Sequence, residues 1–241
     1  MDKLAISMKR INLIIACVIV PITFLSQTKE DKLGSWWMYF GTHHLNEKYS
    51  IHYETQLRHY ELGTNFFQLL PRVGLNYKID ENSMVTAGYA WIPTQPNLDE
   101  GFGGDLVTEN RIWQQFIFRN KISNIKFRHR YRLEQRWIKT PIPNSLITVP
   151  DKNTTYKNRA RYMLSAKIPL SKKEDFPFFL FIYDEVFLHI DDNPFNQNRL
   201  YGALGFQVNK NMNIQAGYLR HRNGDANLNR LQLAVFLNTG N

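Results

Sequence analysis

The sequence contains one cysteine, Cys17, among its 241 residues. A single cysteine excludes an intramolecular disulfide, and it excludes a metal site built from several thiolates. If the chain is exported, its stability must therefore come from its secondary structure and packing alone.

Long apolar runs are missing after residue 25. A transmembrane helix needs about 20 apolar residues, and no later stretch approaches that length. No repeat of twenty to fifty residues is present either, which argues against a propeller or a solenoid. The mean hydropathy of −0.41 suits a soluble protein. It also suits a membrane β-barrel, because lumen-facing residues and loops dilute the apolar half of such a chain.

Residues 1–26 have the layout of a secretory signal peptide. Three basic residues within the first ten precede an apolar run at 11–25, and polar residues follow at once. About fifteen apolar residues interrupted by Pro21 are too few to span a bilayer, so a membrane-anchoring helix is the weaker alternative. We predict cleavage after Ser26, which leaves residues 27–241 as a single β-barrel domain. An exported chain without a spanning helix can cross a membrane only as a closed barrel.

The formal net charge of the chain is +9. Residues 1–26 contribute three basic residues and one acidic residue, so +7 remains without them. An excess of positive charge is typical of proteins that bind nucleic acid, anionic lipid or an anionic solute. Because the chain is predicted to be exported, we expect no nucleic-acid partner.

Residues 125–137 show the most informative pattern. Five of the seven odd positions are apolar or aromatic, and all six even positions are charged. A period of two is typical of an extended strand, whose successive side chains point to opposite faces. The pattern suits a soluble sheet with its charged face in water. It equally suits a membrane strand with its apolar face in lipid and its charged face toward a lumen.

Ten further segments have a similar strand-like pattern: 35–43, 49–60, 66–79, 84–92, 110–120, 156–168, 176–190, 199–208, 212–221 and 228–238. Pro71 predicts a bulge or local break in one of them. The connections alternate between short (80–83, 121–123, 171–175, 209–211) and long (93–109, 139–155, 191–198). Short turns at one end and long loops at the other are typical of an up-and-down membrane barrel, and aromatic residues near the strand ends resemble its interfacial girdles.

The pattern predicts an all-β fold, an up-and-down antiparallel transmembrane β-barrel of 10–12 strands. Eleven segments are an odd number, whereas a closed antiparallel barrel has an even number, so we estimate ten or twelve. Alternation does not say which face turns inward. A membrane barrel places the charged face in the lumen, and a soluble barrel that carries a lipid places it outside.

In the membrane-barrel interpretation, the charged side chains line the lumen. The predicted lumen-lining residues are Glu54, Arg58, Arg72, Arg111, Arg119, Arg128, Arg130, Arg132, Glu134, Arg136, Arg159 and Arg161. Asp184 or Glu185 could join the acidic partners. Guanidinium groups persist there only if they are paired, hydrated or bound to anions. The simpler interpretation is a hydrated Arg/Glu ladder that fills a narrow barrel, and the functional one is an anion-attracting passage or cavity.

Catalytic and metal sites are not indicated by the sequence. The seven histidines are scattered without metal-ligand spacing, so we predict no metal and no cofactor. Ser50, His52 and Glu54 would share one strand face, but steps of roughly 7 Å are too wide for the hydrogen bonds of a triad. We therefore expect no catalytic residues and a protein that is not an enzyme.

Four segments together carry a family resemblance: the aromatic pair Trp36–Trp37, the strand with Glu54 and Arg58, the segment 111–115, and the segment 128–136. They resemble the bacterial domain of unknown function 2490 family. The resemblance covers nearly all of the chain after residue 26. It implies an outer-membrane-type β-barrel in a Gram-negative bacterium, and it brings no established activity or catalytic residues.

Three functional hypotheses follow. The first is an outer-membrane β-barrel without enzymatic activity, either structural or a narrow channel for small solutes, anions among them. Its partners would be outer-membrane lipid and, during biogenesis, the barrel-assembly machinery. The second is an outer-membrane hydrolase acting on lipid, which needs a Ser/His pair at one rim. The third is the soluble periplasmic lipid carrier.

Overall fold

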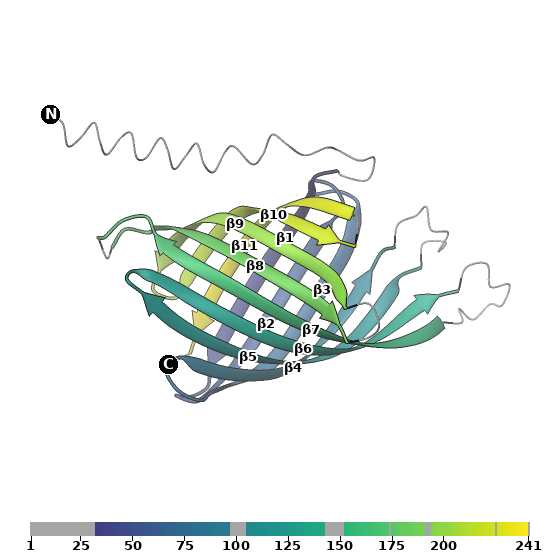
Figure 1. Ribbon diagram of the computed structural model, residues 1–241, viewed down its shortest axis with the longest axis horizontal. Coiled ribbons are helices and arrows are strands. Elements are labelled where there is room, and N and C mark those ends of the chain that lie inside the picture. The colour runs from purple at the N-terminus through teal and green to yellow at the C-terminus, as the bar shows by residue number, and fades with distance from the viewer. Residues whose placement is uncertain are drawn as a thin grey trace. The chain divides into compact units, whose positions relative to one another are not determined.

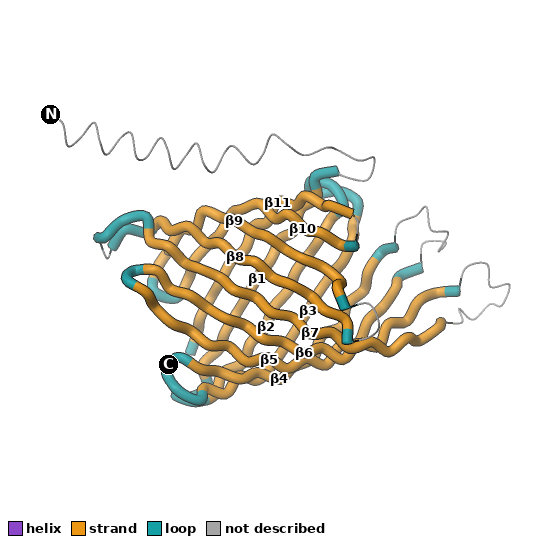
Figure 2. The backbone as a smooth tube through the Cα atoms, in the orientation of Figure 1, coloured by secondary structure: helices purple, strands orange, loops and turns teal. Residues whose placement is uncertain are grey.

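The computed structural model describes residues 32–96, 105–142, 152–173, 175–190, 194–224 and 226–240. The predicted signal peptide and its cleavage site lie outside these residues. The described chain forms eleven strands, drawn in Figures 1 and 2: β1 (Gly34–His44), β2 (Tyr49–His59), β3 (Phe66–Lys78), β4 (Ser83–Thr94), β5 (Val107–Ile122), β6 (Ile125–Pro141), β7 (Lys152–Pro169), β8 (Phe178–His189), β9 (Phe195–Asn209), β10 (Met212–Asn223) and β11 (Ala226–Thr239). No described residue is helical, so none forms a helix that could cross a membrane.

The strands close into one barrel in which sequence neighbours pair antiparallel. This confirms the predicted up-and-down all-β barrel and the predicted range of strand number. The number is nevertheless odd. With eleven alternating strands, β1 and β11 run in the same direction, and they close the barrel as a parallel pair from Gly34↔Arg230 to His43↔Thr239. The expectation of an even number assumed that the closing pair was antiparallel, and here it is not.

The two ends of the barrel differ in their connections. At one end, called the turn end, the strands are joined by residues 45–48, 79–82, 123–124, 170–177 and 210–211. At the other, the loop end, the connections are 60–65, 95–106, 142–151, 190–194 and 224–225. The two longest connections, 95–106 and 142–151, leave the loop end as the sequence predicts. The prediction is wrong for the next pair, because 170–177 at the turn end is longer than 190–194 at the loop end. Figure 1 shows the chain ending at the turn end.

Three of the five turns at the turn end are built in the same way. The side-chain oxygens of Asn46, Asp80 and Asn209 each accept hydrogen bonds from the backbone N–H groups two and three residues later, at 2.7–3.0 Å. Such Asx turns replace the backbone partners that a tight reversal removes. The hydrogen bonds also hold the pKa of Asp80 below its usual value, chiefly through the Asn82 N–H.

Pro71 interrupts one of the two ladders of β3. The register with β2 runs unbroken through Thr55↔Pro71. The register with β4 passes from Gln68↔Thr94 directly to Arg72↔Ala90. A proline has no N–H to donate, so the predicted local break occurs on one side of the strand.

The two faces of the sheet differ sharply in chemistry. Trp113 on β5 is fully buried and faces inward, whereas its neighbour Ile112 is 44% exposed. Large apolar side chains are exposed on the outside of most strands, among them Trp37, Val73, Leu75, Tyr89, Trp91, Phe116, Tyr131, Leu133, Leu164, Ile182, Leu200, Leu204, Leu231 and Leu233. The buried charged residues lie on the opposite face, inside the barrel. The barrel therefore presents a largely apolar wall to its surroundings, with Asp184 as an exposed exception, and holds its buried charged residues within.

Glycines make room for the bulkiest inward side chain. Gly74 and Gly88 face each other across β3 and β4. A Cβ atom at either position would lie within 2.8 Å of the Trp113 ring. The absence of side chains at these two positions on β3 and β4 thus leaves the space that the indole of β5 occupies.

Candidate functional site in the lumen

The barrel encloses an elongated cavity of about 480 Å³. Its lining includes Tyr60 and Phe67 near the loop end and Arg128 and Asn238 near the turn end. One water molecule occupies about 30 Å³ in the liquid, so the cavity has room for on the order of ten to twenty water molecules. The lumen is a space with many polar lining residues that extends from near one end of the barrel to near the other.

Eleven of the twelve predicted lumen residues line this cavity: Glu54, Arg58, Arg72, Arg111, Arg119, Arg128, Arg130, Arg132, Arg136, Arg159 and Arg161. The twelfth, Glu134, is 1% exposed and lies beneath the arginines, in contact with several of them. This placement is the opposite of what a soluble lipid carrier needs, since its apolar face would have to turn inward.

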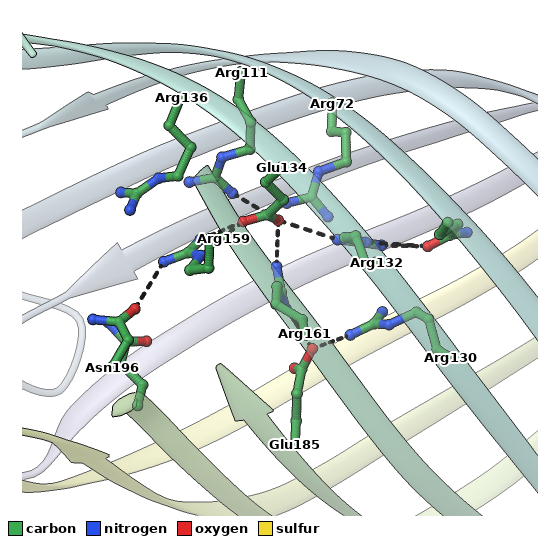
Figure 3. Close-up of polar contacts among 12 residues, drawn as sticks. Arg72, Arg111, Arg130, Arg132, Glu134, Arg136, Arg159, Arg161, Glu185 and Asn196 are labelled. Carbon is green, nitrogen blue, oxygen red and sulfur yellow. Dashed lines mark hydrogen bonds and ion pairs between the residues drawn. The ribbon is translucent and has the colours of Figure 1, made fainter. Parts of the chain in front are cut away.

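Glu134 forms the centre of the ionic network, as Figure 3 shows. Its Oε2 accepts hydrogen bonds from Nε and Nη2 of Arg159, at 2.8 and 2.6 Å. Its Oε1 accepts from Nη1 of Arg161 at 2.7 Å and from Nη1 of Arg111 at 3.3 Å. Arg132 is more distant, with Nη1 at 3.9 Å. One carboxylate thus accepts hydrogen bonds from three guanidinium groups.

Strand register explains how these side chains meet. Glu134 of β6 lies directly opposite Arg159 of β7. Arg111 of β5 and Arg161 of β7 are each displaced by two residues from the position opposite Glu134. Such diagonal neighbours are about 7–8 Å apart at the backbone, a span that the long arginine side chain crosses. Because side chains alternate between the two faces of each strand, Glu134 and the three arginines all project inward from β5, β6 and β7 and meet there.

Two more glutamates extend the network. Glu109 accepts hydrogen bonds from Nε of Arg111 at 2.7 Å and from Nε and Nη2 of Arg136 at 2.9 and 2.8 Å. Glu185 accepts from Nη2 of Arg130 at 2.7 Å and from Nε of Arg161 at 2.9 Å. Arg111 and Arg161 each bind two carboxylates, so the network is a continuous chain from Glu109 to Glu185.

Glu54 holds a separate, smaller group. Its Oε2 pairs with Nη1 of Arg72 at 3.0 Å and lies 3.2 Å from Nε2 of His52. His52 and Glu54 therefore contact each other along one strand, and the prediction that such a step is too wide for a hydrogen bond is wrong for this pair. Ser50, two residues before His52, has another partner: its Oγ accepts a hydrogen bond from Nδ2 of Asn76 at 3.0 Å.

The positive charge of the lumen exceeds its negative charge. Twelve arginines line the cavity, and four glutamates, Glu134 included, face them, which leaves an excess of eight positive charges. Within the described ranges, four of the arginines have no carboxylate within 4.0 Å: Arg58, Arg119, Arg128 and Arg199. The side chains around the lumen therefore carry a net positive charge.

Aromatic rings and amides partly replace the missing carboxylates. The guanidinium carbon of Arg58 lies 3.8 Å from the ring centroid of Trp36, and Nη1 donates to Gln68 at 2.7 Å. Arg199 lies 4.5 Å from the ring centroid of Phe187. Ring faces stabilise a cation without cancelling its charge. These contacts hold the arginines in place and leave their charge uncancelled.

Sequence reasoning missed several residues of the lumen. Glu109 was assigned to a loop, but β5 begins at Val107, so its side chain belongs to the inward face. Arg199 and Arg230 also line the cavity. Both lie in segments with visible alternation, and counting that alternation through β9 and β11 would have found them. Of the two acidic candidates on β8, Glu185 is buried and Asp184 is exposed.

The described residues contain no group of three or more histidine, cysteine or acidic side chains arranged to hold a metal ion. Neither a curated protein nor a solved structure shows a significant match to the chain. The model of one protein family does match, over residues 33–232, which span almost the whole barrel. The chain belongs to this family, which is described as a protein of unknown function (DUF2490).

Proposed function

We propose that this protein is an outer-membrane β-barrel of a Gram-negative bacterium whose lumen admits small anions. The observation that carries the proposal is the pairing of an apolar outer wall with a lumen of excess positive charge. Exposed apolar surface of this extent is unfavourable in water, and it is the surface that a bilayer stabilises.

The lumen is suited to small anions rather than to large solutes. Its volume of about 480 Å³ is shared among more than forty lining side chains. Near the middle of β6, the guanidinium groups of Arg111, Arg159 and Arg161 gather around Glu134. Rings of one sign of charge set the selectivity of a pore, so arginines in this space favour anions and exclude cations.

The membrane part of the proposal is tested by fractionation. Outer membrane, inner membrane and periplasm are separated, and the protein is run on a denaturing gel with and without boiling. We expect it in the outer-membrane fraction, with migration that changes on heating because a closed barrel resists unfolding in detergent. Recovery in the periplasm, or migration that heating does not change, would refute the membrane barrel.

The passage is tested by conductance in a planar bilayer under a potassium chloride gradient. We expect a small conductance with chloride more permeant than potassium. The variant R58Q removes a cation that has no carboxylate partner, so it should lower the chloride preference. K210Q removes an exposed charge in the β9–β10 turn and should leave the preference unchanged. A barrel that inserts but does not conduct would show that the side chains seal the lumen.

A further inference from the structure

A second cavity lies at the turn end, beside the β5–β6 hairpin. This rim pocket has a volume of about 320 Å³ and is lined by Asn82, Arg119, Asn120, Lys121, Lys126, Phe127, Arg128, Ser165, Lys167 and Phe181. Five of these ten residues are cationic and none is acidic. The rim pocket is therefore more uniformly charged than the lumen, where glutamates interrupt the arginines.

Strand register forces the cations together. Lys126 of β6 is opposite Lys121 of β5 and opposite Lys167 of β7, which forms a row of three lysines. In the next inward-facing row, Arg128 is opposite Arg119. Like charges directly opposite each other are destabilising. These like charges on adjacent strands repel one another, and a bound anion would relieve that repulsion.

The protein itself offers little compensation. Within the described ranges, none of the five cations has a carboxylate within 4.0 Å. Nε of Arg128 is buried and has no hydrogen-bond partner among the residues that the structure describes. Lys167 is held by Gln207, to which its Nζ donates at 3.0 Å, and by the ring of Phe179 at 3.8 Å. Neither contact neutralises its charge.

We propose that the rim pocket binds a phosphate group, supplied by free phosphate or by a phosphorylated lipid headgroup. A phosphate carries up to two negative charges and three acceptor oxygens, which matches several converging cations better than a halide does. Paired guanidinium groups bind such oxygens in a bidentate way, and the lysines add point charges around them. The site goes beyond anion passage and does not require the lumen to conduct.

The test is isothermal titration calorimetry, which measures the heat of ligand binding, on the full-length protein in a zwitterionic detergent. The probes are inorganic phosphate, dihexanoyl phosphatidic acid and dihexanoyl phosphatidylcholine. We expect the first two to bind at one site and the third, whose phosphate is covered by choline, to bind more weakly. Binding of inorganic phosphate alone identifies the free ion as the source. Preferential binding of phosphatidic acid, displaced by phosphate, identifies a lipid headgroup.

The variant R119Q/R128Q removes both guanidinium groups of the pocket. We expect a loss of roughly tenfold or more in phosphate affinity, because the variant removes every guanidinium donor that can make charge-assisted hydrogen bonds in the pocket. The control K48Q/K210Q removes the same charge from exposed turns at the same end, and it should bind like the wild type. Heat-modifiable migration checks that each variant is folded.

Three results would overturn the site: no binding of either phosphate probe, unchanged affinity in R119Q/R128Q, or an equal loss in K48Q/K210Q. If R119Q/R128Q does not fold, R128K takes its place. It keeps the charge and loses the planar fork, so phosphate affinity should fall several-fold. Unchanged affinity of R128K would then refute the proposal. Conductance enters none of these readouts, so the rim pocket and the anion passage stand or fall separately.

Discussion

Replacement of Glu134 by glutamine tests whether the buried ionic network stabilises the barrel. The carboxylate accepts hydrogen bonds from Arg111, Arg159 and Arg161 at 2.6–3.3 Å and is 1% exposed. Glutamine keeps the shape, removes the charge and turns an amide donor toward guanidinium groups that are also donors. Breaking a buried ion pair by removing one partner costs about 3–5 kcal/mol, because the other charge stays buried without compensation. We expect a loss of that size in E134Q.

The measurement is urea unfolding in lipid vesicles, followed by tryptophan fluorescence, with the free energy of unfolding taken from the midpoint and slope. E54Q provides a graded comparison, because Glu54 has one arginine partner, Arg72, and should lose less. E47Q is the matched control, since Glu47 is exposed in the β1–β2 turn. Equal stability of E134Q and E47Q would refute the reasoning, and so would a larger loss in E54Q than in E134Q.

Two further substitutions test the two faces of the wall in the same unfolding assay. G88A places a Cβ 2.6 Å from the Trp113 ring, and overpacking of this kind should lower the free energy of unfolding by about 1–3 kcal/mol. G202A, where a Cβ meets nothing within 4 Å, is its control, and equal losses in both would contradict the packing argument. L133R places a charge on the outer wall, where Leu133 is 49% exposed. If that wall faces lipid, the variant should lose about 2–4 kcal/mol in vesicles, and wild-type stability would contradict a lipid-facing position.

Much of the fold could be predicted because strand alternation is a local property. The segment 125–137 and its ten counterparts each reveal a strand from neighbouring residues alone, and all eleven are strands of the barrel. The family resemblance is likewise confirmed over residues 33–232. Cleavage after Ser26 stays a prediction, because residues 1–31 lie outside the described part of the chain.

Strand ends were harder to predict than strands. β5, β6 and β7 extend by several residues into segments rich in polar residues and proline that read as loops, and Glu109 was lost with them. Their outer residues are held by pairing with neighbours such as Thr108↔Lys139 and Pro141↔Lys152, which no local pattern records.

The sequence by itself determined that this chain alternates between an apolar face and an ionised face along eleven strands. It could not determine which face turns inward, because alternation is unchanged when the faces are exchanged. The tertiary structure decided this by closing the sheet around the arginines, with β1 and β11 as a parallel pair. It also decided which charges meet. Glu134 contacts Arg111 and Arg161 because three strands are aligned in one register, and register is a property of the closed sheet rather than of any one strand.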